Sequence, residues 1–217
     1  MDVCFKSPHL YIKLPRKVVD NLKRVSDLST IKKWEYAGYI DVSFEDNKYK
    51  FNDTVYVTSK DRRQVKLEKV RLVWPSLFTF HTHPSITKPS CEKGQIFTTL
   101  PSDADFEAFI KGYPEMQSNV ICDAHGYYLI DIIKSADKNK LPIPEMVSNE
   151  MKEMRKRPFL LDCVFSEEGS EYHQTTLKEW KHFINYDVHY LMNSKFGINI
   201  RYYGYNEEPA TIVLEHV

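Results

Sequence analysis

The sequence predicts a mixed α/β (α+β) fold in which helices flank one largely antiparallel sheet. Two observations carry this prediction. Some segments have apolar residues at every third or fourth position, as amphipathic helices do. Between them lie segments in which apolar and polar residues follow each other in turn, as they do in strands. Short turn-like sequences also join several of the expected strands, as in antiparallel hairpins. The 217 residues contain no internal repeat or low-complexity tract, so we expect one domain with an appendage.

Residues 1–140 are expected to form the main domain, which begins with a helix. Val18, Leu22 and Val25 recur at helical spacing within residues 16–33, which therefore predict an amphipathic helix. The following segments are rich in β-branched and aromatic residues and predict strands at residues 35–44, 48–58, 64–74 and 77–83. Pro84 ends the last of these strands, because proline has no amide proton for a ladder hydrogen bond.

A loop and a second helix follow. Residues 85–101 are rich in Ser, Thr, Pro and Lys and are predicted to form a loop. Ser102 is the expected N-cap of a helix that runs to about Lys111. Two apolar strands are then expected at residues 118–123 and 127–133, joined by a hairpin-like turn.

Residues 141–217 are expected to form a C-terminal helix and strand extension that packs on the main domain or binds a partner protein. The predicted elements are a charged helix to about residue 156, a strand near 159–165, a helix at about 175–192, and strands at 198–205 and 210–214. Basic residues in this part alternate with glutamates, which predicts a solvated helix face. They are Lys152, Arg155, Lys156 and Arg157.

The composition excludes several classes of protein. Lys and Arg total 30 and Asp and Glu total 30, so no overall charge favours nucleic acid or an anionic membrane. The four cysteines are widely spaced, which argues against a disulfide framework or a thiolate zinc site. The N-terminus lacks a signal-peptide core, and no stretch approaches the ~20 apolar residues that span a bilayer. We therefore expect an intracellular protein, cytoplasmic or nuclear, with no nucleic-acid or membrane partner.

The segment His81-Thr82-His83-Pro84 predicts a metal site. Alternate side chains of a strand project to the same face, so His81 and His83 lie roughly 6 to 7 Å apart at the backbone and can bind one ion. Catalytic zinc typically takes three protein ligands and leaves a fourth position for water. Asp105, at the head of the predicted second helix, is the best candidate for the third ligand.

Two further residues suit metal-assisted hydrolysis. A carboxylate near a catalytic zinc must accept a proton from the bound water and deliver one to the leaving amine. Glu35, at the junction of the first helix and first strand, can do both without binding the metal. The Ser102 hydroxyl, at the start of its helix, can donate to the oxygen that becomes negative in a tetrahedral intermediate.

Taken together, three motifs in this order resemble the JAMM (MPN-plus, JAB) metalloprotease family over about residues 15–135. They are Glu35-x-x-Gly38, His81-x-His83-Pro84 and Ser102-x-x-Asp105. The resemblance implies an MPN/JAB-like fold, a Zn²⁺ ion held by His81, His83 and Asp105, water activation by Glu35 and oxyanion stabilisation by Ser102. It also implies hydrolysis of an isopeptide or peptide bond, most often after the C-terminus of ubiquitin or a ubiquitin-like protein.

The chain departs from the family pattern at one point. The link between the histidine pair and the serine is usually short in the family, whereas residues 85–101 intervene here. An insertion there would lie beside the metal and could bind substrate or cover the cleft, or it could be a tolerated surface loop. Ser90 does not restore the short spacing, because Lys93 stands where an aspartate is required.

Several of these residues also have plainer interpretations. An isolated His-x-His pair on a strand is more often structural than metal-binding, and Ser102 with Asp105 also fits an ordinary helix cap. Asp103 is a second candidate ligand, which the family spacing favours less than Asp105. Cys122 and His125 would suit a thiol protease, although a small buried thiol is the commoner role for a cysteine in an apolar strand.

The resemblance leaves three functions open. The first is a zinc isopeptidase that removes ubiquitin or a ubiquitin-like modifier. The second is a non-catalytic scaffold of the same fold; such domains usually lack one or more ligands, and this chain has them all. The third is a peptidase of the same chemistry acting on sulfur-carrier proteins, viral or phage polyproteins or cell-wall peptides.

Overall fold

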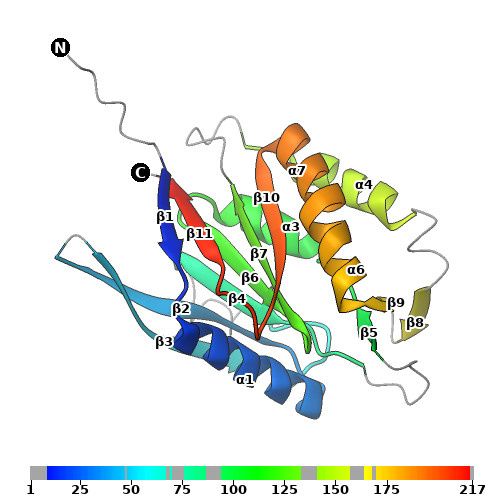
Figure 1. Ribbon diagram of the computed structural model, residues 1–217, viewed down its shortest axis with the longest axis horizontal. Coiled ribbons are helices and arrows are strands. Elements are labelled where there is room, and N and C mark those ends of the chain that lie inside the picture. Colours follow the sequence, from blue (N-terminus) through cyan, green and yellow to red (C-terminus); the bar gives the residue numbers. More distant parts are fainter. Residues whose placement is uncertain are drawn as a thin grey trace.

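The computed structural model describes residues 9–46, 48–66, 69, 76–86, 94–132, 141–156, 164–167 and 170–215. Within them, helices cover both faces of a six-stranded sheet (Figure 1), which confirms the mixed α/β class. The strand order is β10 (Ile198–Gly204), β7 (Gly126–Ile132), β6 (Ser118–Cys122), β4 (Phe78–Thr82), β2 (Tyr36–Glu45) and β3 (Lys48–Thr58). β4 and β6 run parallel, whereas the other neighbouring pairs in this sheet run antiparallel.

Strands β6 and β7 lie inside the sheet and are buried on both faces, which explains their largely apolar sequences. Successive side chains of a strand point to opposite faces, so neighbours in sequence enter different cores. Val120 belongs to the core under α1, whereas Ile121 belongs to the core on the other face. The sheet is thus the middle layer of three.

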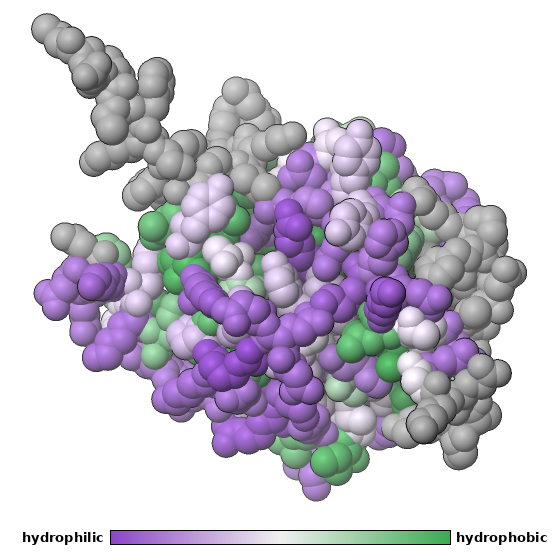
Figure 2. Space-filling model, in the orientation of Figure 1, coloured by the Kyte–Doolittle hydropathy of each residue, from purple (hydrophilic) through white to green (hydrophobic). Residues whose placement is uncertain are grey.

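Helix α1 (Arg16–Lys32) covers one face of the sheet, as the spacing of its apolar residues predicts. Val18, Leu22 and Val25 are buried against strand residues such as Phe80. The opposite side of α1 carries charged side chains, and this surface is mainly hydrophilic in Figure 2. Among the helices of the described residues, none combines the length and the apolar character that crossing a membrane requires.

The other face of the sheet is covered by α3 (Asp103–Gly112), α4 (Pro144–Arg155) and a long C-terminal helix (Figure 1). The long helix consists of α6 (Leu177–His182), the π-helical segment η2 (Phe183–Val188) and α7 (His189–Phe196). Trp180, Ile184 and Met192 on this helix are buried in the same core as Phe106 and Phe109 of α3. Asp105, the predicted third metal ligand, is therefore carried by a helix anchored on both the sheet and the C-terminal helices.

Residues of the C-terminal segment, 141–215, contribute to all three sheets. β10 lies at one edge of the central sheet. β11 (Thr211–Glu215) pairs with β1 (His9–Lys13). β8 (Val164–Glu167) and β9 (Ser170–Thr176) form a three-stranded sheet with β5 (Gln95–Thr98), which precedes Ser102.

The structure differs from the sequence prediction in several places. The prediction that residues 85–101 form a loop is wrong at β5, a short strand that pairs with β9. Neither β1 nor β9 was predicted, and residues 64–66 of the strand predicted at 64–74 have no regular structure. Residues 67–68 and 70–74 of that strand, and 159–163 of the strand predicted near 159–165, lie outside the described residues.

Candidate metal centre

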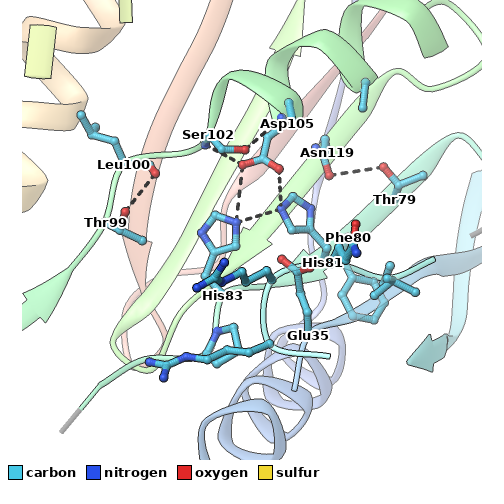
Figure 3. Close-up of a pocket in the computed structure, with 18 of the residues that line it drawn as sticks. Glu35, Thr79, Phe80, His81, His83, Thr99, Leu100, Ser102, Asp105 and Asn119 are labelled. Atoms are coloured by element: carbon cyan, nitrogen blue, oxygen red, sulfur yellow. Dashed lines mark hydrogen bonds and ion pairs between the residues drawn. The ribbon is translucent and has the colours of Figure 1, made fainter. Parts of the chain in front are cut away.

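The predicted ligands meet in a cleft of about 730 Å³ between β2, β4 and α3. His81 and His83 stand at the end of β4, just before Pro84, and Asp105 lies in the first turn of α3. In Figure 3, Asp105 reaches both imidazoles from α3, and Glu35 points toward them from the start of β2. We call Glu35, His81, His83, Ser102 and Asp105 the motif residues; all five line the cleft.

Strand register explains why Glu35 lies beside the histidines. β2 and β4 are antiparallel with Ala37 opposite His81, and continuing this register by two residues sets Glu35 opposite His83. The main chain of Glu35 is fixed by Asp61 O, which accepts its N–H at 2.7 Å, and by the Thr58 hydroxyl, which donates to its carbonyl oxygen at 2.7 Å.

Gly38 in the first motif is required by backbone packing. A Cβ atom at this position would lie 2.0 Å from Val55 O and 2.9 Å from the Phe80 side chain. Because Gly38 has no side chain, β3 can pair closely with β2 and the Phe80 ring can pack against the backbone of Gly38. Gly38 therefore supports the strand that carries Glu35.

The ligand atoms lie close together. His81 Nε2 and His83 Nε2 are 3.2 Å apart. Asp105 Oδ1 is 3.0 Å from His81 Nε2, and Asp105 Oδ2 is 3.4 Å from His83 Nε2. Ligand atoms of Glu35, His81 and His83 all lie within 4.8 Å of one another, so this group can hold a metal ion. The structure thus brings Asp105 and Glu35 to the same histidine pair.

Ser102 is an N-cap and at the same time supports Asp105. Its hydroxyl accepts a hydrogen bond from Asp105 N at 3.3 Å, and its own N–H donates to Asp105 Oδ2 at 2.6 Å, which completes a capping box. The capping interpretation from the sequence is therefore confirmed. It is compatible with the ligand interpretation, because the same carboxylate also contacts both imidazoles.

The two carboxyl groups beside the histidines have opposite pKa shifts. Burial raises the pKa of Glu35 to about 7; the charge of His83 opposes this rise, and Asp105 and Asp61 add to it. Burial would also raise the pKa of Asp105, but charge attraction and hydrogen bonds from His81 and His83 hold it well below its ordinary value. Asp105 therefore stays anionic, whereas Glu35 can gain and lose a proton near neutral pH.

The plainer alternatives do not assemble a site of their own. Asp103, the second candidate ligand, forms an ion pair with Arg155 at 3.0 Å instead. Cys122 is fully buried, and burial raises the pKa of its thiol far above the ordinary value, which leaves it unreactive. The N–H of His125 donates to Asp123 Oδ1 at 2.8 Å within the hairpin turn.

The sequence did not indicate that the C-terminal segment lines the cleft. Its contributing residues, which we call the C-terminal lining, are Arg155, Glu171, Tyr172 and His173. Arg155 belongs to the predicted solvated basic face, but its side chain is only 23 % exposed. The cleft side chains of β9 depend on its pairing with β5, so no local sequence pattern could have found them.

The chain matches no protein-family model and no curated protein. The resemblance to JAMM proteases therefore rests on the motif residues and their arrangement alone.

Proposed function

We propose that this protein is a JAMM-type zinc metalloprotease that hydrolyses the isopeptide or peptide bond after ubiquitin or a ubiquitin-like modifier. The observation that carries this proposal is the convergence of Glu35 on the group formed by His81, His83 and Asp105 in one cleft. The order of elements also agrees with the resemblance: β2 follows Glu35, the histidine pair ends β4, and Ser102 caps α3.

The donor set suits zinc. Imidazole nitrogens and a carboxylate oxygen are common zinc ligands, and two atoms bound to one tetrahedral zinc are roughly 3.3 Å apart. The two imidazole nitrogens are 3.2 Å apart, and Asp105 offers one oxygen to each of them, Oδ1 at 3.0 Å from His81 Nε2 and Oδ2 at 3.4 Å from His83 Nε2. Ser102 N–H holds the same carboxylate at 2.6 Å, as outer-shell donors hold ligands in metal sites. We therefore assign Asp105 as the third protein ligand. Glu35 is assigned as the residue that activates the water molecule.

In the proposed reaction, Glu35 and Ser102 have different roles. A bound zinc ion supplies a Lewis acid that lowers the pKa of water. Glu35 accepts a proton from the attacking water and passes it to the nitrogen of the bond that breaks, so that the amine leaves neutral. The Ser102 hydroxyl accepts from Asp105 N–H, and its own proton is free to stabilise the negative carbonyl oxygen.

The test is a cleavage assay on a panel of linked ubiquitins. Zinc-loaded wild-type protein is expected to cleave at least one linkage, a chelator to stop cleavage, and added zinc to restore it. Glu35→Gln should lower kcat about 10²- to 10⁴-fold while zinc content is unchanged, because only proton transfer is lost. Glu171→Gln removes another carboxylate from the same cleft and should leave kcat unchanged.

Two results would contradict the proposal. If zinc-loaded wild-type protein leaves every linked ubiquitin intact, the modifier assignment is wrong and a non-catalytic scaffold or another peptide substrate is favoured. If cleavage occurs but Glu35→Gln is as active as wild type, the role of Glu35 is wrong.

A further inference from the structure

Arg155 connects the C-terminal segment to the start of α3. From the last turn of α4 its guanidinium donates to two acceptors, Asp103 Oδ1 at 3.0 Å and Pro101 O at 2.9 Å. These acceptors belong to the residues on either side of Ser102. Because a guanidinium is planar and rigid, it fixes both acceptors at once. The backbone of Ser102 is thereby held between two bonded neighbours.

The position of Ser102 determines that of the metal-site carboxylate. Ser102 N–H donates to Asp105 Oδ2 at 2.6 Å, and the two oxygens of Asp105 contact His81 and His83. A contact path therefore runs from Arg155 through the backbone of Ser102 to Asp105. A displacement of this backbone would therefore weaken one of the contacts that orient the carboxylate.

Arg155 also compensates a charge. The first turn of α3 contains two carboxylates, Asp103 and Asp105, whose like charges repel each other. Arg155 forms an ion pair with Asp103 from α4, whereas the Ser102 N–H donates to Asp105. Lys152 faces the same Asp103 carboxylate at 3.8 Å, but its side chain is 56 % exposed.

A second contact from the C-terminal segment holds the same stretch of chain. The Tyr128 hydroxyl donates to Thr99 O at 2.8 Å and accepts from Trp180 Nε1 at 2.7 Å. Trp180 is completely buried on α6. The link between β5 and α3 is thus supported by α4 at one point and, through Tyr128, by α6 at another.

We propose that Arg155 is a positioning residue for Ser102 and Asp105, so that the C-terminal segment is part of the support of the metal centre. The proposal rests on the proposed function for the roles of those two residues. Loss of an outer-shell partner of a metal ligand typically costs 10- to 100-fold in metal affinity or activity.

The experiment compares Arg155→Gln, Arg155→Lys and Lys152→Ala in the full chain. Zinc affinity is measured by competition with a chromophoric chelator, kcat and KM on a cleaved ubiquitin linkage, and folding by thermal melting. Arg155→Gln is expected to weaken zinc binding and lower kcat, each by about 10-fold, the lower end of the range for a direct partner of a ligand, because Arg155 acts through Ser102. Arg155→Lys keeps the charge but bonds one acceptor, so its losses should be intermediate. Lys152→Ala should show no measurable change, because its contact is long and exposed.

The outcomes separate positioning from general destabilisation. Zinc affinity that falls in Arg155→Gln, at temperatures where the variant is folded, and recovers in part in Arg155→Lys supports the proposal. Unchanged zinc affinity and kcat in Arg155→Gln, or equal losses in Lys152→Ala, would overturn it. Wild-type protein that binds zinc but cleaves nothing contradicts the proposed hydrolase, while the affinity comparison still decides the role of Arg155. Wild-type protein that binds no zinc would overturn both proposals.

Discussion

The motif residues and the C-terminal lining face the same cleft, yet the chain positions them by different means. His81 and His83 stand at the end of an apolar strand, and Ser102 caps a helix, so each position follows from local sequence. The C-terminal lining depends on α4 and on β9, whose place is set by pairing with β5 far away in the sequence. Local sequence therefore places the candidate ligand groups at the ends of their strand and helix, whereas tertiary packing sets the shape and support of the cleft.

The largest effect is expected at a motif residue. Ser102→Ala should lower kcat about 10²- to 10³-fold through loss of an oxyanion donor. The free energy of unfolding should fall by only about 1 kcal/mol through loss of the N-cap. Thr176→Ala is the matched control, because Thr176 forms the same capping box on α6 outside the cleft. Enzyme kinetics and urea unfolding should show equal destabilisation of the two variants, with kcat lost in Ser102→Ala alone. A similar kcat in both would assign Ser102 to capping only.

Metal binding should stabilise the fold through the motif residues. At a free zinc concentration 100 times the Kd, the free energy of unfolding of wild-type protein should rise by about 2.7 kcal/mol, because the ion binds only the folded chain. His83→Ala should lose this rise, whereas His125→Ala, a change in the nearby hairpin turn, should keep it. Thermal melting with and without zinc measures the difference. If zinc stabilises His83→Ala as much as it stabilises wild-type protein, His83 is excluded as a ligand.

A smaller effect is expected where the C-terminal segment supports the cleft. Tyr128→Phe removes a hydroxyl that bonds Thr99 O and Trp180 Nε1, and leaves both groups without this partner. The free energy of unfolding should fall by about 2 kcal/mol. Tyr203→Phe, on the neighbouring strand and only partly buried, should change it by less than about 0.5 kcal/mol. Equal unfolding curves for Tyr128→Phe and wild type would show that this contact does not support the fold.

The same contrast explains which parts of the fold could be predicted. The helix at 16–33 and the strand at 48–58 have strong internal periodicity, and both are found almost as predicted. β5 has only four residues and β9 is largely polar, so neither sequence shows a strand pattern of its own until the two strands pair. Residue patterns therefore predicted the elements of the central sheet better than those of the small sheets.

For the candidate site, the sequence indicated the chemical groups but could not predict their support. The contacts of Asp105 with His81 and His83 agree with the predicted ligand set. The bonds from Arg155 to Pro101 and Asp103 could not be predicted, because a charged residue on an amphipathic helix is ordinarily solvated. Only the packing of α4 beside α3 turns this residue toward the cleft.

The most direct test of the metal centre is the zinc content of wild-type, Glu35→Gln and Asp105→Ala proteins after dialysis against zinc-free buffer. We predict one tightly bound zinc per chain in wild type and in Glu35→Gln, and none in Asp105→Ala. Wild-type protein without zinc would contradict the assignment of a zinc site to the motif residues. So would zinc retained by Asp105→Ala and lost by Glu35→Gln, since that result would make Glu35 the third ligand.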